Sequence, residues 1–347
     1  MKRLLIIDFL NKNKSHLNFN NSFIMAIKSN QCNINFIGVK SHCNEISDKN
    51  INIRAIADSK GSWVTQVIKI FFKVILSRKE RSIIVLAIDN YISPLLFSLF
   101  SPLFLRKKLT IVIHNNIRPL VKSKIKRIPF LLFSKLINHQ FICLTKSGYD
   151  AMIKMGFNKT FFIKHMNFSH QNSISKKVDI KFPKNKTNIV FVGRQAKFFV
   201  EEIMTNLNLA PYTNLNLIVL YKKELPIKEK CISQYKDWVE DEQLIYLLET
   251  ADFSFFHNHN VEYRPSGILL DSISNNCPII APEIGHFLET KEYNIGYYYK
   301  DNISLIQLFD NLNKKGIKRN SFPNKNFESA QNLTALHQFS KEINALI

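Results

Sequence analysis

Short apolar runs rich in Ile, Val and Phe recur along this 347-residue chain, and they limit its possible folds more than any other feature. In the first half these runs are Leu4 to Phe9, Ile34 to Val39, Ile83 to Ile88, Thr110 to His114, Phe141 to Leu144 and Thr160 to Ile163. Helical patterns, such as Ser147 to Met155, lie between several of them. Because parallel strands need long crossovers and are buried on both faces, this alternation indicates a parallel α/β sheet.

The alternation stops at residues 169–187, which are polar and rich in Lys, and then starts again. The second series of runs is Ile189 to Val192, Leu217 to Tyr221, Phe253 to Phe256, Pro278 to Ala281 and Gly296 to Tyr299. A capping-type start and apolar spacing predict a helix over Asp241 to Thr250. We therefore expect an N-terminal domain over 1–168, a linker over 169–187 and a second domain over 188–326. Residues 327–347 are expected to form a C-terminal helix, for which packing back on the N-terminal domain is one option.

Charge is the most unusual bulk property of the chain. Its 48 Lys and Arg against 27 Asp and Glu give a net charge of +21, which favours an anionic partner: nucleic acid, acidic membrane lipid or a phosphorylated substrate. No zinc-finger spacing, RNP run or helix-turn-helix pattern is present, so nucleic acid is the weakest of these. The five cysteines are scattered without a CxxC pair, and the first apolar run is short and contains Asp8. We therefore expect a cytoplasmic protein without a signal peptide, disulfide framework or zinc site.

Two apolar segments of the first half leave a choice between burial and membrane contact. Tyr91 to Leu105 contains Pro94 and Pro102 and is too short to cross a bilayer as a helix. Trp63 to Leu76 has a narrow polar stripe, which is typical of a helix buried on most of its surface. Basic residues follow both segments, so contact with an anionic membrane surface stays open as the alternative.

The loop after Val192 is a candidate anion site. Ligands of parallel sheets bind at the carboxyl ends of strands, and this loop directly follows one. Gly193 permits close approach of the backbone, and Arg194 and Lys197 place two positive charges about one helical turn apart. Such a pair suits a diphosphate. A solvated basic turn is the other interpretation.

A second loop, Tyr263 to Asp271, ends in a helix start with small residues. The first amides of a helix lack intrahelical acceptors, so Ser266 and Gly267 could bind a phosphate through the backbone. Asp271 lies about one turn further on and could accept hydrogen bonds from a ribose diol. Alternatively, it is an acid placed favourably in the helix dipole.

The third candidate is His114, which ends a strand and is followed by Asn115, Asn116 and Pro119. At a strand end its imidazole can point into a ligand site, although a single His is more often structural. His165, which also follows a strand-like run, is a weaker candidate.

Taken together, these loops resemble the GT-B glycosyltransferases, in particular the large retaining family that uses nucleotide-sugar donors for polysaccharide and lipid-linked glycan synthesis. The resemblance lies mainly between Ile189 and Tyr299, in Gly193-Arg194, Asp241 to Asp252, Ser266-Gly267 to Asp271, Pro278 to Ala281, and Gly285. It implies two doubly wound Rossmann-like domains facing each other across a cleft. It also implies that Arg194 and Lys197 neutralise the donor diphosphate, Ser266 and Gly267 bind it through their amides, and Asp271 holds the ribose.

His114 would lie beside the transferred sugar. Eight residues before Asp271, where the family has a carboxylate that contacts the sugar, stands Tyr263, with Glu262 beside it. Both are included in the expected site, and the donor sugar and the stereochemical outcome stay open.

The resemblance implies an enzyme that transfers a sugar to a saccharide acceptor, of a lipid-linked kind, in bacterial surface polysaccharide synthesis of the O-antigen, capsule or lipopolysaccharide type. It implies no metal and no cofactor other than the nucleotide sugar as substrate, and a place at the inner face of the cytoplasmic membrane. A sugar-nucleotide epimerase of the same fold and a non-catalytic GT-B subunit of a glycan-assembly complex are the alternatives.

Overall fold

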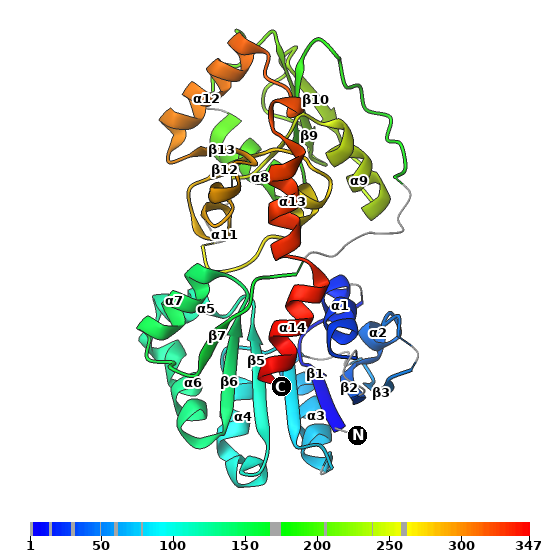
Figure 1. The fold of residues 1–347 in the computed structure, drawn as a ribbon, viewed down its shortest axis with the longest axis vertical. Helices are drawn as coiled ribbons and strands as arrows, with labels where there is room; N and C mark the ends of the chain where they lie inside the picture. Colours follow the sequence, from blue (N-terminus) through cyan, green and yellow to red (C-terminus); the bar gives the residue numbers. More distant parts are fainter. Residues whose placement is uncertain are drawn as a thin grey trace. The chain divides into compact units, whose positions relative to one another are not determined.

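The computed structural model describes residues 3–13, 16–28, 32–48, 50–58, 62–77, 79–166, 175–204, 207–237, 239–257 and 262–347. The chain divides into two compact units (Figure 1). Unit 1 contains residues up to 168 together with 262–265 and 334–347, and unit 2 contains 169–261 and 266–333. Residues 169–174 of the predicted linker lie outside the described part of the chain.

Unit 1 is built on a seven-stranded parallel sheet in the order β3-β2-β1-β4-β5-β6-β7. Its strands are β1 (Arg3–Asp8), β2 (Asn33–Val39), β3 (Asn52–Ile56), β4 (Ser82–Ala87), β5 (Lys108–Ile113), β6 (His139–Cys143) and β7 (Thr160–Phe162). Its helices are α1 (Leu17–Lys28), α2 (Lys40–Cys43), α3 (Trp63–Leu76), α4 (Ile92–Leu99), the 3₁₀ turn η1 (Ser101–Phe104), α5 (Ile117–Lys122), α6 (Lys124–Leu136), α7 (Lys146–Lys154) and α14 (Leu336–Leu346). The predicted doubly wound parallel sheet is thereby confirmed for this half.

Successive side chains of the central strands alternate between the two faces of this sheet. In β1, Leu5 and Ile7 pack with α3, α4 and α6, whereas Leu4 and Ile6 pack with α1 and α14. Because both faces are covered, the central strands are apolar throughout, which is why they could be recognised in the sequence.

Two segments join unit 1 from far along the sequence. Helix α14 lies beside α1 (Figure 1), and its Ser340 donates a hydrogen bond to the carbonyl of Ala26 at 2.6 Å. The segment that was expected to be one helix, 327–347, forms two, α13 (Asn324–Leu333) and α14, separated at Thr334 and Ala335. Residues 262–265, expected within the second domain, also belong to unit 1, since Tyr263 packs against its core and Ser147 Oγ donates to the carbonyl of Glu262 at 2.5 Å.

Unit 2 has a six-stranded parallel sheet in the order β10-β9-β8-β11-β12-β13. The strands are β8 (Thr187–Phe191), β9 (Leu215–Leu220), β10 (Ile232–Tyr235), β11 (Phe253–Phe255), β12 (Ile279–Pro282) and β13 (Gly296–Tyr299). The helices are α8 (Arg194–Phe198) with the π-helical turn η2 (Phe199–Ile203), α9 (Asp241–Thr250), α10 (Gly267–Ser274), α11 (Gly285–Leu288), η5 (Lys291–Tyr293), α12 (Asn302–Lys315), η6 (Arg319–Ser321) and α13. The predicted helix over Asp241 to Thr250 is confirmed at both ends.

The two strands that the sequence did not predict, β3 and β10, both lie at a sheet edge. Their side chains are mostly half-buried, so neither carries the continuous apolar run that marks a central strand.

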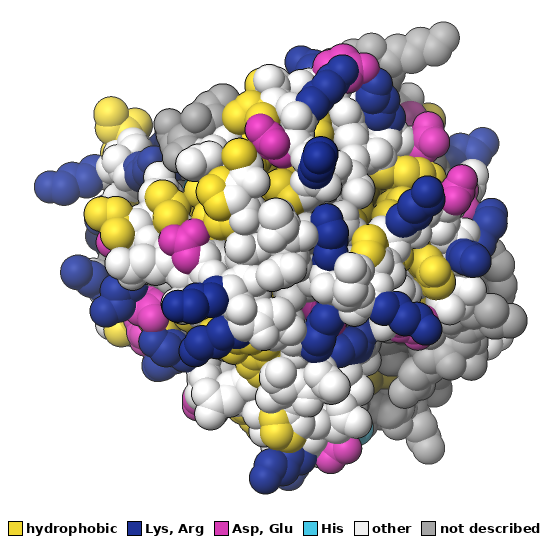
Figure 2. All heavy atoms as spheres, turned by 90° about the horizontal axis from the view of Figure 1, so that it is seen from above, with side chains coloured by type: hydrophobic (Ala, Val, Ile, Leu, Met, Phe, Trp, Pro, Cys, Tyr) yellow, Lys and Arg dark blue, Asp and Glu magenta, His cyan; other side chains and the backbone are white. Residues whose placement is uncertain are grey.

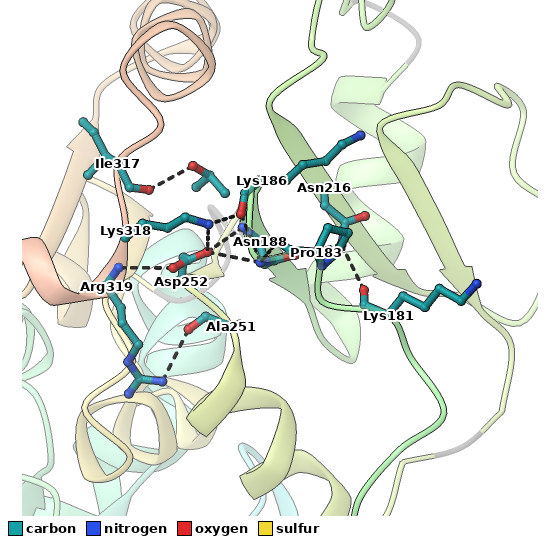
Figure 3. A network of polar contacts seen from close by, with 11 residues as sticks. Lys181, Pro183, Lys186, Asn188, Asn216, Ala251, Asp252, Ile317, Lys318 and Arg319 are labelled. Atoms are coloured by element: carbon teal, nitrogen blue, oxygen red, sulfur yellow. Dashed lines mark hydrogen bonds and ion pairs between the residues drawn. The ribbon is translucent and has the colours of Figure 1, made fainter.

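A polar network joins several elements of unit 2 at the amino edge of its sheet (Figure 3). The carboxylate of Asp252, just before β11, accepts from the amide of Asn188 in β8 at 2.8 Å and from Lys318 at 3.1 Å. The guanidinium of Arg319 donates to the carbonyls of Leu248 and Ala251 at the end of α9 and of Asn275 and Asn276 at the end of α10. The carboxyl ends of both helices are therefore fixed by one side chain, which satisfies carbonyls that the helices leave open.

We expect Arg319→Ala to lower the free energy of unfolding of unit 2 by about 2–3 kcal/mol, because several carbonyls lose a charged donor. The apparent melting temperature should fall by roughly 5–10 °C. Thermal unfolding followed by calorimetry measures this, with Arg319→Lys as a partial replacement and Lys315→Ala, exposed on α12, as the matched control. An Arg319→Ala protein as stable as the control would contradict the role of this network.

Candidate functional site

A pocket of about 630 Å³ in unit 2 contains three of the predicted site residues, Gly193, Arg194 and Lys197. Its lining comes from the carboxyl ends of β8 and β9, from α8, from the segment that follows β10, and from α9 and α10: Val192, Gly193, Arg194, Lys197, Glu201, Leu220, Tyr221, Lys222, Lys223, Asp237, Val239, Asp241, Leu244 and Ile268. Volumes of this size are usual for small-molecule sites. The lining combines apolar side chains with four cations and three acids, Glu201, Asp237 and Asp241, so apolar and charged parts of a ligand would both find partners there.

Gly193 forms the turn between β8 and α8 with φ 58° and ψ −127°. Side chains rarely adopt this left-handed region, so the turn requires glycine. It brings Gly193, Arg194 and Lys197 into the lining of one pocket. Arg194 is exposed. Lys197 forms an ion pair with Glu201 at 3.8 Å, and both of these side chains are exposed to solvent. An exposed pair of this kind contributes little energy, so Lys197 can exchange it for an anionic ligand.

Helix α8 is held in place by side chains that could not be identified from the sequence. Gln195 Oε1 accepts from the amide of His257, which follows β11, at 2.8 Å. Tyr299 Oη donates to the carbonyl of Phe256 at 2.7 Å, so Nδ1 of His257 must be the donor in its 2.8 Å contact with Tyr299. Nε2 of His257 then faces Glu202 of η2 at 3.4 Å. These contacts hold the start of α8, and with it Arg194, against the carboxyl ends of β11 and β13.

Helix α10 carries the second group of predicted residues. Ser266 is its N-cap, and Ser266 Oγ accepts from the amide of Leu269 at 3.4 Å. The amide of Ser266 itself donates to Nδ1 of the buried His286 at 3.1 Å, so it is already used within the protein. The amide of Gly267 is the first of α10, and the space where its side chain would stand is open. Asp271 is partly buried one turn further along α10, whose Ile268 lines the pocket.

His114 lies in unit 1, at the carboxyl end of β5. With His16, Asn11 and Asn115 it lines a hollow of about 60 Å³. The ring of Phe19 lies edge-on to His114 with centroids 4.5 Å apart, and the ring of His16 lies 5.4 Å away. Of the predicted site residues of unit 1, His114 lines this hollow at the carboxyl edge of the sheet, whereas Glu262, Tyr263 and His165 do not line it.

Burial sets the charge of these histidines. Desolvation holds the pKa of His114 well below its usual value, and the neighbouring His16 and His165 lower it further. Desolvation lowers the pKa of His165 to about 4, against the hydrogen bond that its Nδ1 makes with the carbonyl of Met166. Both imidazoles are neutral at pH 7, so they can donate and accept hydrogen bonds without adding charge.

The segment 262–265 of unit 1 contains the predicted Glu262 and Tyr263. Desolvation, followed by a hydrogen bond to the Glu262 side chain, raises the pKa of Tyr263 to about 12. Next to them, Arg264 donates to Oδ1 of Asn115 at 3.3 Å. Arg264 was not among the residues predicted from the sequence, although it directly follows Glu262 and Tyr263, which were.

Within the described residues, no group of three or more His, Cys, Asp and Glu side chains could hold a metal ion. Nor is any described helix both long enough and apolar enough to span a membrane.

No known protein-family model matches the sequence, and no curated protein matches it. Solved structures do resemble this chain. Anabaena HepE in complex with UDP is 12% identical with a TM-score of 0.71, over 100% of this chain and 99% of that one. WaaG, a glycosyltransferase involved in lipopolysaccharide biosynthesis, is 8% identical with a TM-score of 0.63, over 100% and 99%. A glycosyltransferase from Rickettsia africae is 13% identical with a TM-score of 0.63, over 99% and 97%.

These similarities, with the two parallel sheets of Rossmann-like order, show that the chain has the GT-B fold of glycosyltransferases. The fold class expected from the sequence is confirmed. The assignments of His114, Arg194, Lys197, Gly193, Ser266, Gly267, Asp271, Glu262 and Tyr263 remain predictions.

We expect the free energy of unfolding to fall as the pH drops from about 6.5 to about 4. The pKa of His165 is lower in the folded chain than in the unfolded chain, so the unfolded chain binds the additional proton in this interval. This residue alone accounts for a loss of about 3 kcal/mol, and His114 acts in the same direction. Urea unfolding at several pH values measures the loss, which His165→Asn should reduce and His337→Asn, at an exposed position of α14, should not. Equal slopes in all three proteins would contradict the interpretation.

Proposed function

We propose that this protein transfers a sugar from a nucleotide-diphosphate donor to a saccharide acceptor. The single observation that carries the proposal is the pocket of about 630 Å³, in which Gly193, Arg194 and Lys197 stand at the carboxyl edge of the unit 2 sheet beside α10. Ligands of doubly wound sheets bind at this edge. Apolar lining residues such as Val239 and Leu244 suit a base, and the cations suit a diphosphate.

The chemistry of such a transfer needs little more than stabilisation of the leaving group. Negative charge grows on the diphosphate as the bond to the sugar breaks, and Arg194 and Lys197 would meet it without a metal ion. The amide of Gly267 at the positive end of α10 would add to this, and Asp271 would accept hydrogen bonds from the ribose. His114 would contact the sugar as a neutral imidazole.

Uridine is the first base to test, since HepE has been solved with UDP and with UDP-glucose. An epimerase of the same fold would turn over the donor without an acceptor, and a non-catalytic subunit would bind the nucleotide without turnover. Both outcomes are distinguishable in one assay that follows nucleotide release with and without a saccharide.

Replacing Arg194 with Ala should lower kcat by on the order of 10²–10³, because one preorganised charge is lost from the leaving-group site. Lys197→Ala should cost less, since its partner Glu201 is left exposed rather than buried. Release of UDP from UDP-sugars measures the change, and Lys314→Ala, exposed on α12, is the control. Unchanged turnover in Arg194→Ala would exclude this pocket as the diphosphate site.

A second part of the proposal concerns the acceptor, which we take to be lipid-linked and held at the cytoplasmic face of a membrane. Helices α3, α4 and α6 cover one face of the unit 1 sheet, and their solvent side, with η1, is unusually apolar. This surface, called here the helical face, consists of Trp63, Phe72, Leu76, Leu95, Leu99, Leu103, Leu105, Ile125, Ile128, Leu132 and Leu136, all exposed.

Charge favours an anionic membrane as the partner of the helical face. Between Trp63 and Leu136 the two acids are Glu80 and Asp89, and both are buried. Exposed cations such as Lys69, Arg106 and Lys124 stand among the apolar side chains. The face shown in Figure 2 differs, because its Lys and Arg side chains are spread among acidic and uncharged ones. Apolar side chains ringed by cations and without exposed acids are typical of interfacial membrane binding.

The double variant Leu99→Glu and Ile125→Glu should bind vesicles containing phosphatidylglycerol at least tenfold more weakly, because two side chains that are 74% and 75% exposed no longer enter the bilayer surface. Sedimentation with vesicles measures binding, and added salt should weaken it further. Ile303→Glu, at a 69% exposed position of unit 2, is the matched control. If the wild-type protein does not bind such vesicles, the membrane part of the proposal is refuted, whereas the proposed sugar transfer is not affected.

We further assign the reaction to the synthesis of a bacterial surface polysaccharide. Support comes from WaaG, which acts in lipopolysaccharide biosynthesis and shares the fold.

A further inference from the structure

The pocket of unit 2 extends across the carboxyl ends of three neighbouring strands, β8, β9 and β10. Arg194 lies just after β8, Lys223 after β9 and Asp237 after β10, and all three line the pocket. Neighbouring strands lie about 4.8 Å apart, so the ends of β8 and β10 are separated by roughly 10 Å. A nucleoside diphosphate is long enough to span this distance. With its diphosphate at Arg194, its base therefore lies beside β10 and the start of α9.

Two carboxylates stand at this far end of the pocket. Asp237 lies two residues beyond β10, and Asp241 is the first residue of α9. Both are exposed, and neither makes a hydrogen bond or an ion pair with another residue that the structure describes. The third acid of the lining, Glu201, differs because it pairs with Lys197 at 3.8 Å. The two Asp carboxylates are therefore available to a ligand, and as carboxylates they only accept hydrogen bonds.

The start of α9 is capped without the side chain of Asp241. Gln243 Oε1 accepts from the amide of Glu240 at 3.0 Å, so the cap comes from these two residues. The helix dipole favours an acid in the first turn, and this preference does not use up the hydrogen-bonding oxygens of that acid. The local structure of α9 therefore leaves the carboxylate of Asp241 available at the pocket.

The nucleobases differ in what they offer to a carboxylate. Guanine carries two adjacent donors, N1–H and the 2-amino group, which match the two oxygens of one carboxylate. Its O6, next to N1, accepts from a cation such as the exposed Lys223. Uracil has one N–H between two carbonyl oxygens, and both oxygens repel a carboxylate that approaches this edge. A pocket end that combines available carboxylates with a cation therefore favours guanine over uracil.

We propose that the donor nucleotide is guanosine diphosphate and that Asp237 and Asp241 select its base. The inference rests on the proposed sugar transfer and concerns the base alone. HepE has been solved with UDP, but at 12% identity the shared fold does not carry over the side chains that contact a base. The apolar Val239 and Leu244 suit the faces of any base, so the carboxylates decide which base binds. The release assays of the proposed function then use GDP-sugars beside UDP-sugars.

Calorimetry on the full chain tests the inference with three nucleotides: GDP, UDP and inosine diphosphate, which lacks the 2-amino group of guanine. The proteins are wild type, the double variant Asp237→Asn and Asp241→Asn, and Glu328→Gln. Asn keeps the size of Asp and adds donors that suit a uracil carbonyl. Glu328→Gln is the matched control, because it converts an exposed acid of α13, outside the lining of the pocket, to its amide. Equal melting temperatures establish that the variants are folded.

Wild type should bind GDP on the order of 10- to 100-fold more tightly than UDP, the ratio that a bidentate contact to a base supplies, with inosine diphosphate in between. The double variant should lose this preference, because its affinity for GDP falls and its affinity for UDP does not. Glu328→Gln should keep the preference.

Three results would each overturn the inference and leave the proposed sugar transfer standing. These are wild-type affinity for UDP that equals or exceeds that for GDP, equal affinities for GDP and inosine diphosphate, and a preference for GDP that survives in the double variant. If wild type binds none of the three nucleotides, the proposed function itself is refuted.

Discussion

The contacts of Asp252 and Arg319 join the strands and helices of unit 2 at the amino edge of its sheet, and the site at the other edge depends on them. In a parallel sheet with crossover helices, the carboxyl ends of the helices meet the amino ends of the strands. Carbonyls left open there must find donors inside the protein. Arg319 supplies them for α9 and α10 together, while Asp252 accepts from Asn188, Lys318 and the amide of Arg319.

The amino-terminal ends of the same helices lie at the carboxyl edge, where Gln243 caps the start of α9 through the amide of Glu240 and the Ser266 side chain caps α10. Hydrogen bonds within the protein also fix the backbone at the carboxyl edge. Gln195 is bound by the amide of His257, and the amide of Ser266 is bound by His286. These contacts fix where Arg194 and Gly267 stand, and preorganised charges stabilise a leaving group better than mobile ones.

The fold followed from the sequence wherever a strand is buried on both faces, because such a strand must be apolar along its whole length. The edge strands β3 and β10 gave no such signal. Gly193 and Arg194, which line the pocket of unit 2, were recognisable as candidates because small and charged residues directly follow a strand there, whereas the roles of Ser266 and Asp271 remain predictions. The roles of His257 and His286 could not be predicted, since each depends on a partner about 20 to 60 residues away in the sequence.

The positive charge of the chain has different surroundings in different parts of the molecule. On the helical face, cations stand between exposed apolar side chains while Glu80 and Asp89 are buried, so the charge of this surface is positive. In the pocket of unit 2, four cations stand beside apolar and acidic side chains around one hollow, where shape and hydrogen-bond geometry bear on what can bind. Net charge alone therefore does not separate a broad positive surface from a specific anion site; the neighbours of each cation do.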